Sequence, residues 1–117
     1  MAARVLIVDD HAMFRAMTRR MLGAQGYEVV GEAATAAAAV EAVNRLRPDI
    51  VLLDVQLPDR DGFAVAEQLA SGEVTPTVVL ISSRDASSYR QRLSDSPARG
   101  FLPKSELTAA ALSALVA

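Results

Sequence analysis

The stretch Asp49-Ile50-Val51-Leu52-Leu53-Asp54 decides the fold that this sequence predicts. Its four central residues are all apolar and do not alternate with polar residues, which is typical of a strand covered on both faces of a parallel sheet. Residues 4–8 (Arg4-Val5-Leu6-Ile7-Val8) and 77–81 (Thr77-Val78-Val79-Leu80-Ile81) have the same character. Residues 27–30 and 100–102 are weaker candidates of similar length. We therefore expect five short strands.

Apolar residues recur at helical spacing in the segments that separate these strands. The segment 86–95 is the weakest of them, because it offers only Tyr89 and Leu93 as an apolar pair. Thr35 is expected to cap the second helix, and Ser105 the last one. The expected helices cover residues 11–25, 35–47, 61–70, 86–95 and 105–116.

The regular alternation of strand and helix predicts the fold class. We expect an α/β domain over residues 1–117, with a doubly wound five-stranded parallel sheet, right-handed crossovers and helices on both faces. At 117 residues and 51% hydrophobic, the chain is large enough to bury one continuous core.

Composition narrows the classes of function. The chain has no cysteine, so thiolate metal sites, disulfides and a cysteine nucleophile are excluded. Its 12 basic and 14 acidic residues give a net charge of −2, and no Lys/Arg block is available to neutralise nucleic-acid phosphates. The apolar run near the N-terminus is too short for a signal peptide or a membrane span. We expect a soluble, cytoplasmic protein that binds neither membranes nor nucleic acid directly.

Polar residues follow four of the expected strands. Asp9 and Asp10 come after the first, Asp54 after the third, Ser82 after the fourth and Lys104 after the fifth. Because the carboxyl ends of parallel strands meet at one edge of the sheet, where ligands bind, we expect these side chains to converge.

Three converging carboxylates repel one another unless a cation is present, and oxygen ligands around a small site suit Mg²⁺. Asp54, at the end of the central strand, is placed to act as a carboxylate nucleophile. The Lys104 ammonium would offset negative charge on the phosphoryl oxygens, and the Ser82 hydroxyl would donate a hydrogen bond to one of them. The residues therefore predict phosphoryl transfer onto Asp54.

These motifs together resemble the receiver domains of two-component response regulators over essentially the whole chain. Residues 100–105 (Gly-Phe-Leu-Pro-Lys-Ser) look most like receivers of the NarL/LuxR type, which usually precede a DNA-binding helix-turn-helix. The resemblance implies the flavodoxin-like strand order 2-1-3-4-5. It is carried by Asp9-Asp10, residues 49–54, Leu57-Pro58 with Gly62, Ser82 and Lys104.

The resemblance also implies roles for individual residues. Mg²⁺ would be held by Asp9, Asp10, Asp54 and the backbone carbonyl of Gln56. Ser82 would be the switch hydroxyl, and Phe101 the aromatic residue whose rotamer follows it, although Phe101 is equally well a core aromatic. Like other receivers, the chain would catalyse only its own phosphorylation and dephosphorylation.

Partners follow from the same resemblance. The phosphoryl donor would be a sensor histidine kinase or a small phosphodonor. The output would be a DNA-binding domain or a protein partner outside this chain, with a transcriptional role, and phosphorylation would favour a dimer.

The predicted fold class also allows three other functions. A haloacid-dehalogenase-type phosphatase needs a general acid two residues after the nucleophile, where this chain has Gln56. A flavodoxin-like cofactor module needs a phosphate-binding loop after the first strand, where the Asp9-Asp10-His11 sequence of this chain would repel phosphate. His11 is expected to be an exposed residue of the first helical turn. A receiver-like interaction module that works without phosphorylation stays open.

Overall fold

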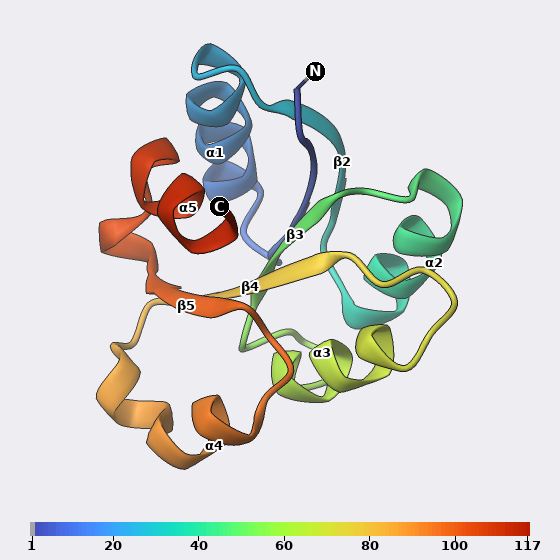
Figure 1. Ribbon diagram of the computed structural model, residues 1–117, viewed down its shortest axis with the longest axis vertical. Coiled ribbons are helices and arrows are strands. Elements are labelled where there is room, and N and C mark those ends of the chain that lie inside the picture. The colour runs from blue at the N-terminus through green and yellow to red at the C-terminus, as the bar shows by residue number, and fades with distance from the viewer. Residues whose placement is uncertain (1) are drawn as a thin grey trace.

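In the computed structural model, which describes residues 2–117, five parallel strands form one sheet in the order β2-β1-β3-β4-β5 (Figure 1). This order and the all-parallel pairing confirm the predicted flavodoxin-like fold. The strands are β1 (Arg4–Val8), β2 (Glu28–Ala33), β3 (Ile50–Asp54), β4 (Thr77–Ser82) and β5 (Gly100–Pro103).

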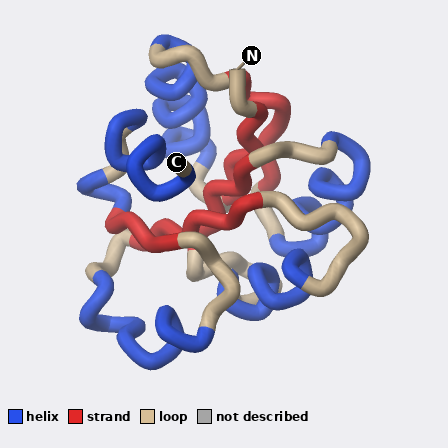
Figure 2. Tube along the Cα trace, in the orientation of Figure 1, coloured by secondary structure: helices blue, strands red, loops and turns tan. Residues whose placement is uncertain are grey.

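Helices cover both faces of the sheet, which lies between them as the red layer in Figure 2. Helices α1 and α5 pack on one face; α2, α3 and α4 pack on the other. Among residues 2–117, no helix is long and apolar enough to cross a membrane. The helical elements are α1 (Ala12–Ala24), α2 (Ala36–Leu46), α3 (Gly62–Ala70), α4 (Arg90–Asp95) and α5 (Ala109–Val116), with 3₁₀ turns η1 (Ala86–Tyr89) and η2 (Lys104–Glu106).

The continuous apolar runs of the central strands supply both halves of the core. In β1, Val5 and Ile7 face α1 and α5, whereas Leu6 and Val8 face α2 and α3. Successive side chains of a strand point to opposite faces, so a strand with helices on both sides needs apolar residues at every position. All five residues of β3 are buried for this reason. The core therefore anchors the strand that ends in Asp54.

The second strand runs further than predicted. The predicted strand ends before Gly31, but β2 continues to Ala33. A Cβ atom at residue 31 would lie 2.7 Å from Cδ1 of Leu46, so Gly31 lets α2 approach the sheet closely rather than ending the strand.

Two helical predictions need correction. The segment 86–95 is not one helix but the 3₁₀ turn η1 followed by the six-residue α4, because the Asp85 carboxylate accepts the Ser87 N–H and favours a tight turn there. Ser105 does not cap the last helix. It lies in η2, and the cap of α5 is Thr108, whose Oγ1 accepts the Ala111 N–H at 3.0 Å.

Candidate functional site at the carboxyl edge of the sheet

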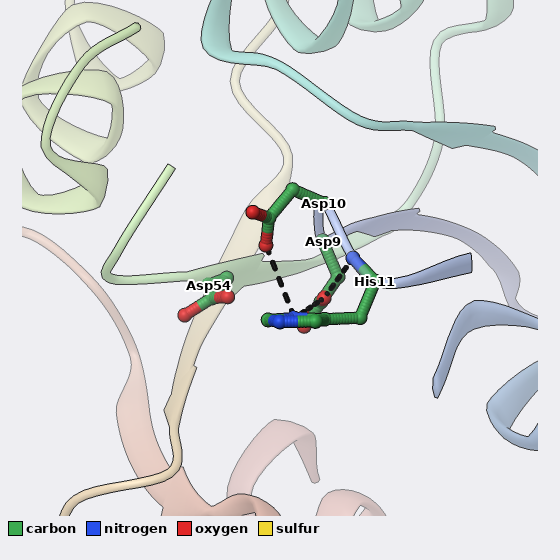
Figure 3. Close-up of side chains that lie close together, drawn as sticks. All are labelled: Asp9, Asp10, His11 and Asp54. Atoms are coloured by element: carbon green, nitrogen blue, oxygen red, sulfur yellow. Dashed lines mark hydrogen bonds and ion pairs between the residues drawn. The ribbon is translucent and has the colours of Figure 1, made fainter. Parts of the chain in front are cut away.

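The predicted site residues come from the carboxyl ends of different strands. Asp9 and Asp10 follow β1, Asp54 ends β3, and Lys104 follows β5. In Figure 3 the carboxylates of Asp9, Asp10 and Asp54 lie around one small volume, with the His11 ring beside them. Parallel pairing of β1 with β3 brings the two strand ends together, so the predicted convergence of the three carboxylates is confirmed.

Asp9 is fully buried, and its two oxygens have different partners. Oδ1 accepts the backbone N–H of His11 at 2.8 Å. Oδ2 accepts no hydrogen bond of normal geometry from the described residues, although the Lys104 Nζ lies 2.5 Å away as an ion pair. A buried carboxylate oxygen held only by a charge keeps a lone pair available for a cation.

Lys104, the only lysine of the chain, sits between the two buried carboxylates. Its Nζ lies 3.2 Å from Asp54 Oδ2 and also over the Phe14 ring, 4.6 Å from the centroid. Burial acts to lower the pKa of Lys104, but the contact with Asp9 and the charge of Asp54 outweigh it, and the pKa is raised. The side chain is therefore a fixed ammonium at neutral pH.

Asp54 is 3% exposed at the end of β3. Burial raises the pKa of Asp54, and the hydrogen bond from the Gln56 N–H at 3.1 Å and the charge of Lys104 oppose this shift. A cation close to Asp54 would act in the same direction as Lys104 and favour the ionised, nucleophilic form.

Gly62 lets α3 begin against the backbone of Asp54. A Cβ atom at residue 62 would lie 2.3 Å from the Asp54 carbonyl oxygen, and the Gly62 N–H donates to the Val55 carbonyl at 2.7 Å. The glycine therefore fixes the loop between β3 and α3 close to the site.

The donor set fits a small divalent cation. Ligand atoms of Asp9, Asp10, His11 and Asp54 all lie within 4.8 Å of one another. Three carboxylates against one ammonium leave an excess of negative charge, and carboxylate oxygens are the ligands that Mg²⁺ prefers. The side chain of Asp10 is 36% exposed, so the cluster is open to solvent on that side.

Ser82 is fully buried, and its hydroxyl bonds to groups other than the carboxylates. Its Oγ lies 3.0 Å from the Tyr89 hydroxyl and accepts the Arg84 N–H at 3.1 Å. Phe101 is partly buried and packs edge-on to Tyr89, with 5.8 Å between ring centroids. The two residues expected to form the switch are thus joined through a third.

Sequence reasoning missed three contacts of this region. His11 is exposed, as expected, but its Nδ1 lies 3.1 Å from an oxygen of both Asp9 and Asp10; adjacency in the chain was an available signal. Phe14 fits the helical apolar spacing of residues 11–25, and this spacing gives no sign of its contact with Lys104. The sequence predicts Tyr89 only as an apolar partner of Leu93, and no local pattern indicates that its hydroxyl reaches residue 82.

Most of this chain is similar in sequence to parts of known proteins. The chain is 42% identical over 103 residues to the transcriptional regulatory protein PdtaR of Mycobacterium tuberculosis, which covers 86% of this chain and 49% of that protein. It is 38% identical to a protein-glutamate methylesterase/protein-glutamine glutaminase of Alkalilimnicola ehrlichii, covering 89% of this chain and 27% of that protein. This chain thus spans half or less of the length of these relatives.

A solved structure of a receiver domain is also similar to this chain. The signal receiver domain of the response regulator NarL from Mycobacterium tuberculosis superposes with a TM-score of 0.81 at 36% identity, covering 98% of this chain and 97% of that one. Residues 5–116 match the family model for the response regulator receiver domain. The resemblance found in the sequence is confirmed: this chain belongs to the response regulator receiver domain family.

Proposed function

We propose that this chain is the phosphoacceptor module of a two-component system and that Asp54 takes up a phosphoryl group with Mg²⁺ bound. One observation carries the proposal: the Asp54 carboxylate ends a buried strand within reach of two further carboxylates and of the Lys104 ammonium. A nucleophile, a cation site and a fixed positive charge then act on one small volume.

The chemistry requires one new bond and one broken bond. A carboxylate oxygen of Asp54 attacks the phosphorus of the donor and forms an acyl phosphate. The bond between phosphorus and the donor nitrogen or oxygen breaks, and the leaving group keeps its electron pair and takes up a proton. Mg²⁺, when bound, would offset the charge that develops on the phosphoryl oxygens. Lys104 offsets a further part of that charge from its place beside Asp54.

Individual roles follow from this proposal. Asp9, Asp10 and Asp54 would hold the cation through their carboxylates, and Gln56 through its backbone carbonyl. The Ser82 hydroxyl would turn to a phosphoryl oxygen, and Phe101 would respond to that change. The Gln56 N–H contact with Asp54 supports the loop placement on which the carbonyl ligand depends.

Donor and output lie outside this chain. We propose a sensor histidine kinase as the donor, with a small phosphodonor as substitute. We also propose a cytoplasmic location for this chain and a dimer of the phosphorylated form. PdtaR is named a transcriptional regulator, which favours a transcriptional output, either a DNA-binding domain or a protein partner. With a net charge of −2, this chain is not expected to bind nucleic acid itself.

The test is incubation with Mg²⁺ and phosphoramidate, followed by intact mass. Phosphoramidate is preferred to acetyl phosphate, which can also acetylate Lys104. We expect one phosphoryl group on the wild type and none on Asp54→Asn or in EDTA. Asp59→Asn, which removes an exposed aspartate of the same loop, is the matched control and should label like the wild type. Equal labelling of Asp54→Asn would refute the assignment, and a wild type that takes up nothing would favour the phosphorylation-independent interaction module.

A further inference from the structure

Tyr89 lies in the segment that follows β4, and its side chain contacts Ser82 at the end of that strand. The residue is 7% exposed, and its hydroxyl lies 3.0 Å from the buried Ser82 Oγ. Its ring packs between two others, with centroids 5.6 Å from Phe63 and 5.8 Å from Phe101. Tyr89 thus contacts α3, the end of β4 and β5 at the same time.

The number of hydrogen bonds that Ser82 can make determines whether its contact with the Tyr89 hydroxyl can persist after phosphorylation. A serine hydroxyl has one proton to donate and two lone pairs to accept with. The Arg84 N–H occupies one lone pair. If Ser82 donates its proton to a phosphoryl oxygen, its contact with Tyr89 persists only when the Tyr89 O–H donates to the second lone pair. Phosphorylation therefore fixes the direction of this buried hydrogen bond or breaks it.

The backbone around Tyr89 is placed to respond. Tyr89 is the last residue of η1 and the residue that precedes α4, so its position determines where α4 starts. The neighbouring ring, Phe63, carries the Arg92 guanidinium of α4 at 4.3 Å from its centroid. Arg92 also pairs with Asp61, the N-cap of α3, at 2.6 Å. A shift of the Tyr89 ring would therefore move the Phe63 ring that packs on it. Movement of Phe63 would in turn disturb the contacts of Arg92 in α4 with Phe63 and with Asp61 at the start of α3.

We propose that Tyr89 is the positioning residue that couples the Ser82 hydroxyl to the segment 84–95, with Phe101 following the Tyr89 ring rather than Ser82 directly. This inference rests on the proposed phosphorylation of Asp54.

Tyrosine fluorescence gives a direct test, because the chain has no tryptophan and only two tyrosines. In Tyr27→Phe, all tyrosine emission comes from Tyr89. We expect that emission to change on incubation with phosphoramidate and Mg²⁺, in proportion to the phosphorylated fraction measured by intact mass. In the double variant Tyr27→Phe/Ser82→Ala, the change per phosphorylated molecule should be lost. An unchanged emission at full phosphorylation, or an equal change without Ser82, would overturn the proposal.

A second measurement separates coupling from packing. Tyr89→Phe keeps the ring stack and removes only the hydroxyl, so it should fold and still be phosphorylated on Asp54. Phosphorylation should alter amide hydrogen exchange over residues 84–95 in the wild type, and Tyr89→Phe should lose most of that response. Tyr27→Phe, which removes a hydroxyl 2.6 Å from Ser113 Oγ on the other side of the sheet, is the matched control and should keep it.

The two proposals fail in different ways. If the wild type takes up no phosphoryl group, the proposed function fails. If all variants are phosphorylated and Tyr89→Phe responds like the wild type, only the role of Tyr89 is refuted.

Discussion

The end of β3 and the segment that contains η1 and α4 differ sharply in how they are held. All five residues of β3 are buried, and its last residue is tied to Lys104 and to the Gln56 N–H. None of the six residues of α4 is buried. The helix is held by the buried Tyr89 that precedes it, by Leu93 against the core, and by the contacts of Arg92 with Phe63 and Asp61. The proposed function needs both a rigid site for the chemistry and a segment that is weakly enough packed for a small change at the site to move it.

The largest expected effect tests this difference itself. Native-state hydrogen exchange should show β3 amides opening only with global unfolding and α4 amides opening locally, with protection factors about 10³-fold apart. Uniform protection across β3 and α4 would show that the two regions unfold as one cooperative unit and do not differ in local stability.

A second prediction concerns the removal of the positive charge of Lys104 from the site. Lys104→Met leaves the buried Asp9 and Asp54 carboxylates without their counterion, so without metal the protein should lose about 3 kcal/mol of unfolding free energy. Mg²⁺ should restore part of this loss by binding the folded form. Urea melts in EDTA and in Mg²⁺ measure both effects, and Lys104→Arg, which keeps the charge, is the control. A variant as stable as the wild type in EDTA would mean that the ion pairs are not needed.

A third prediction relieves the repulsion in the same cluster. Asp10→Asn keeps the shape and removes one charge, so the metal-free protein should gain about 0.5–2 kcal/mol of stability. The rise in Tm on adding Mg²⁺ should be smaller than in the wild type, because the cation loses a ligand. Asp95→Asn removes the same charge from α4 and should leave the Mg²⁺ response unchanged. Loss of stability in Asp10→Asn would identify Asp10 as a structural residue.

The smallest effect concerns the support behind Asp9. Arg15 Nη1 donates to the Asp9 carbonyl at 2.6 Å, and Arg15 and Arg19 both pair with Glu32. The side-chain hydrogen bond from Arg19 holds the pKa of Glu32 below its ordinary value; burial opposes this, and Arg15 adds to it. Glu32→Gln should therefore cost about 0.5–1 kcal/mol at neutral pH.

The pH dependence of that cost has a definite sign. A carboxyl whose pKa is lowered by folding contributes stability above its unfolded pKa, and the contribution is lost as the pH falls through the folded value. Urea melts across this acidic range should show wild type and Glu32→Gln converging. Glu41→Gln, whose contact with Arg45 is long at 3.6 Å and exposed, should show a smaller difference at every pH. A constant difference down to the lowest pH would exclude the charge as its origin.

The parts of the site that the sequence could predict are those set by strand ends. A buried parallel strand has a continuous apolar run, so the polar residue after it is visible by contrast, and parallel pairing places all such residues at one edge. Asp9, Asp54 and Lys104 were found in this way. The predicted start of α5 is wrong because Ser105 and Thr108 are both acceptable caps in sequence. In the structure Ser105 lies in η2, whose first residue Lys104 contacts Asp9 and Asp54, and Thr108 caps α5.

The sequence by itself determined the sheet, its edge and the charges gathered there, because these depend on local apolar runs and on the parallel order of strands. The tertiary structure alone decided that the Tyr89 hydroxyl meets Ser82, that Phe14 lies against Lys104, and that the Asp9 Oδ2 is left to an ion pair. Such contacts depend on how chain turns and helix faces are oriented in space, and no periodicity in the sequence encodes that orientation.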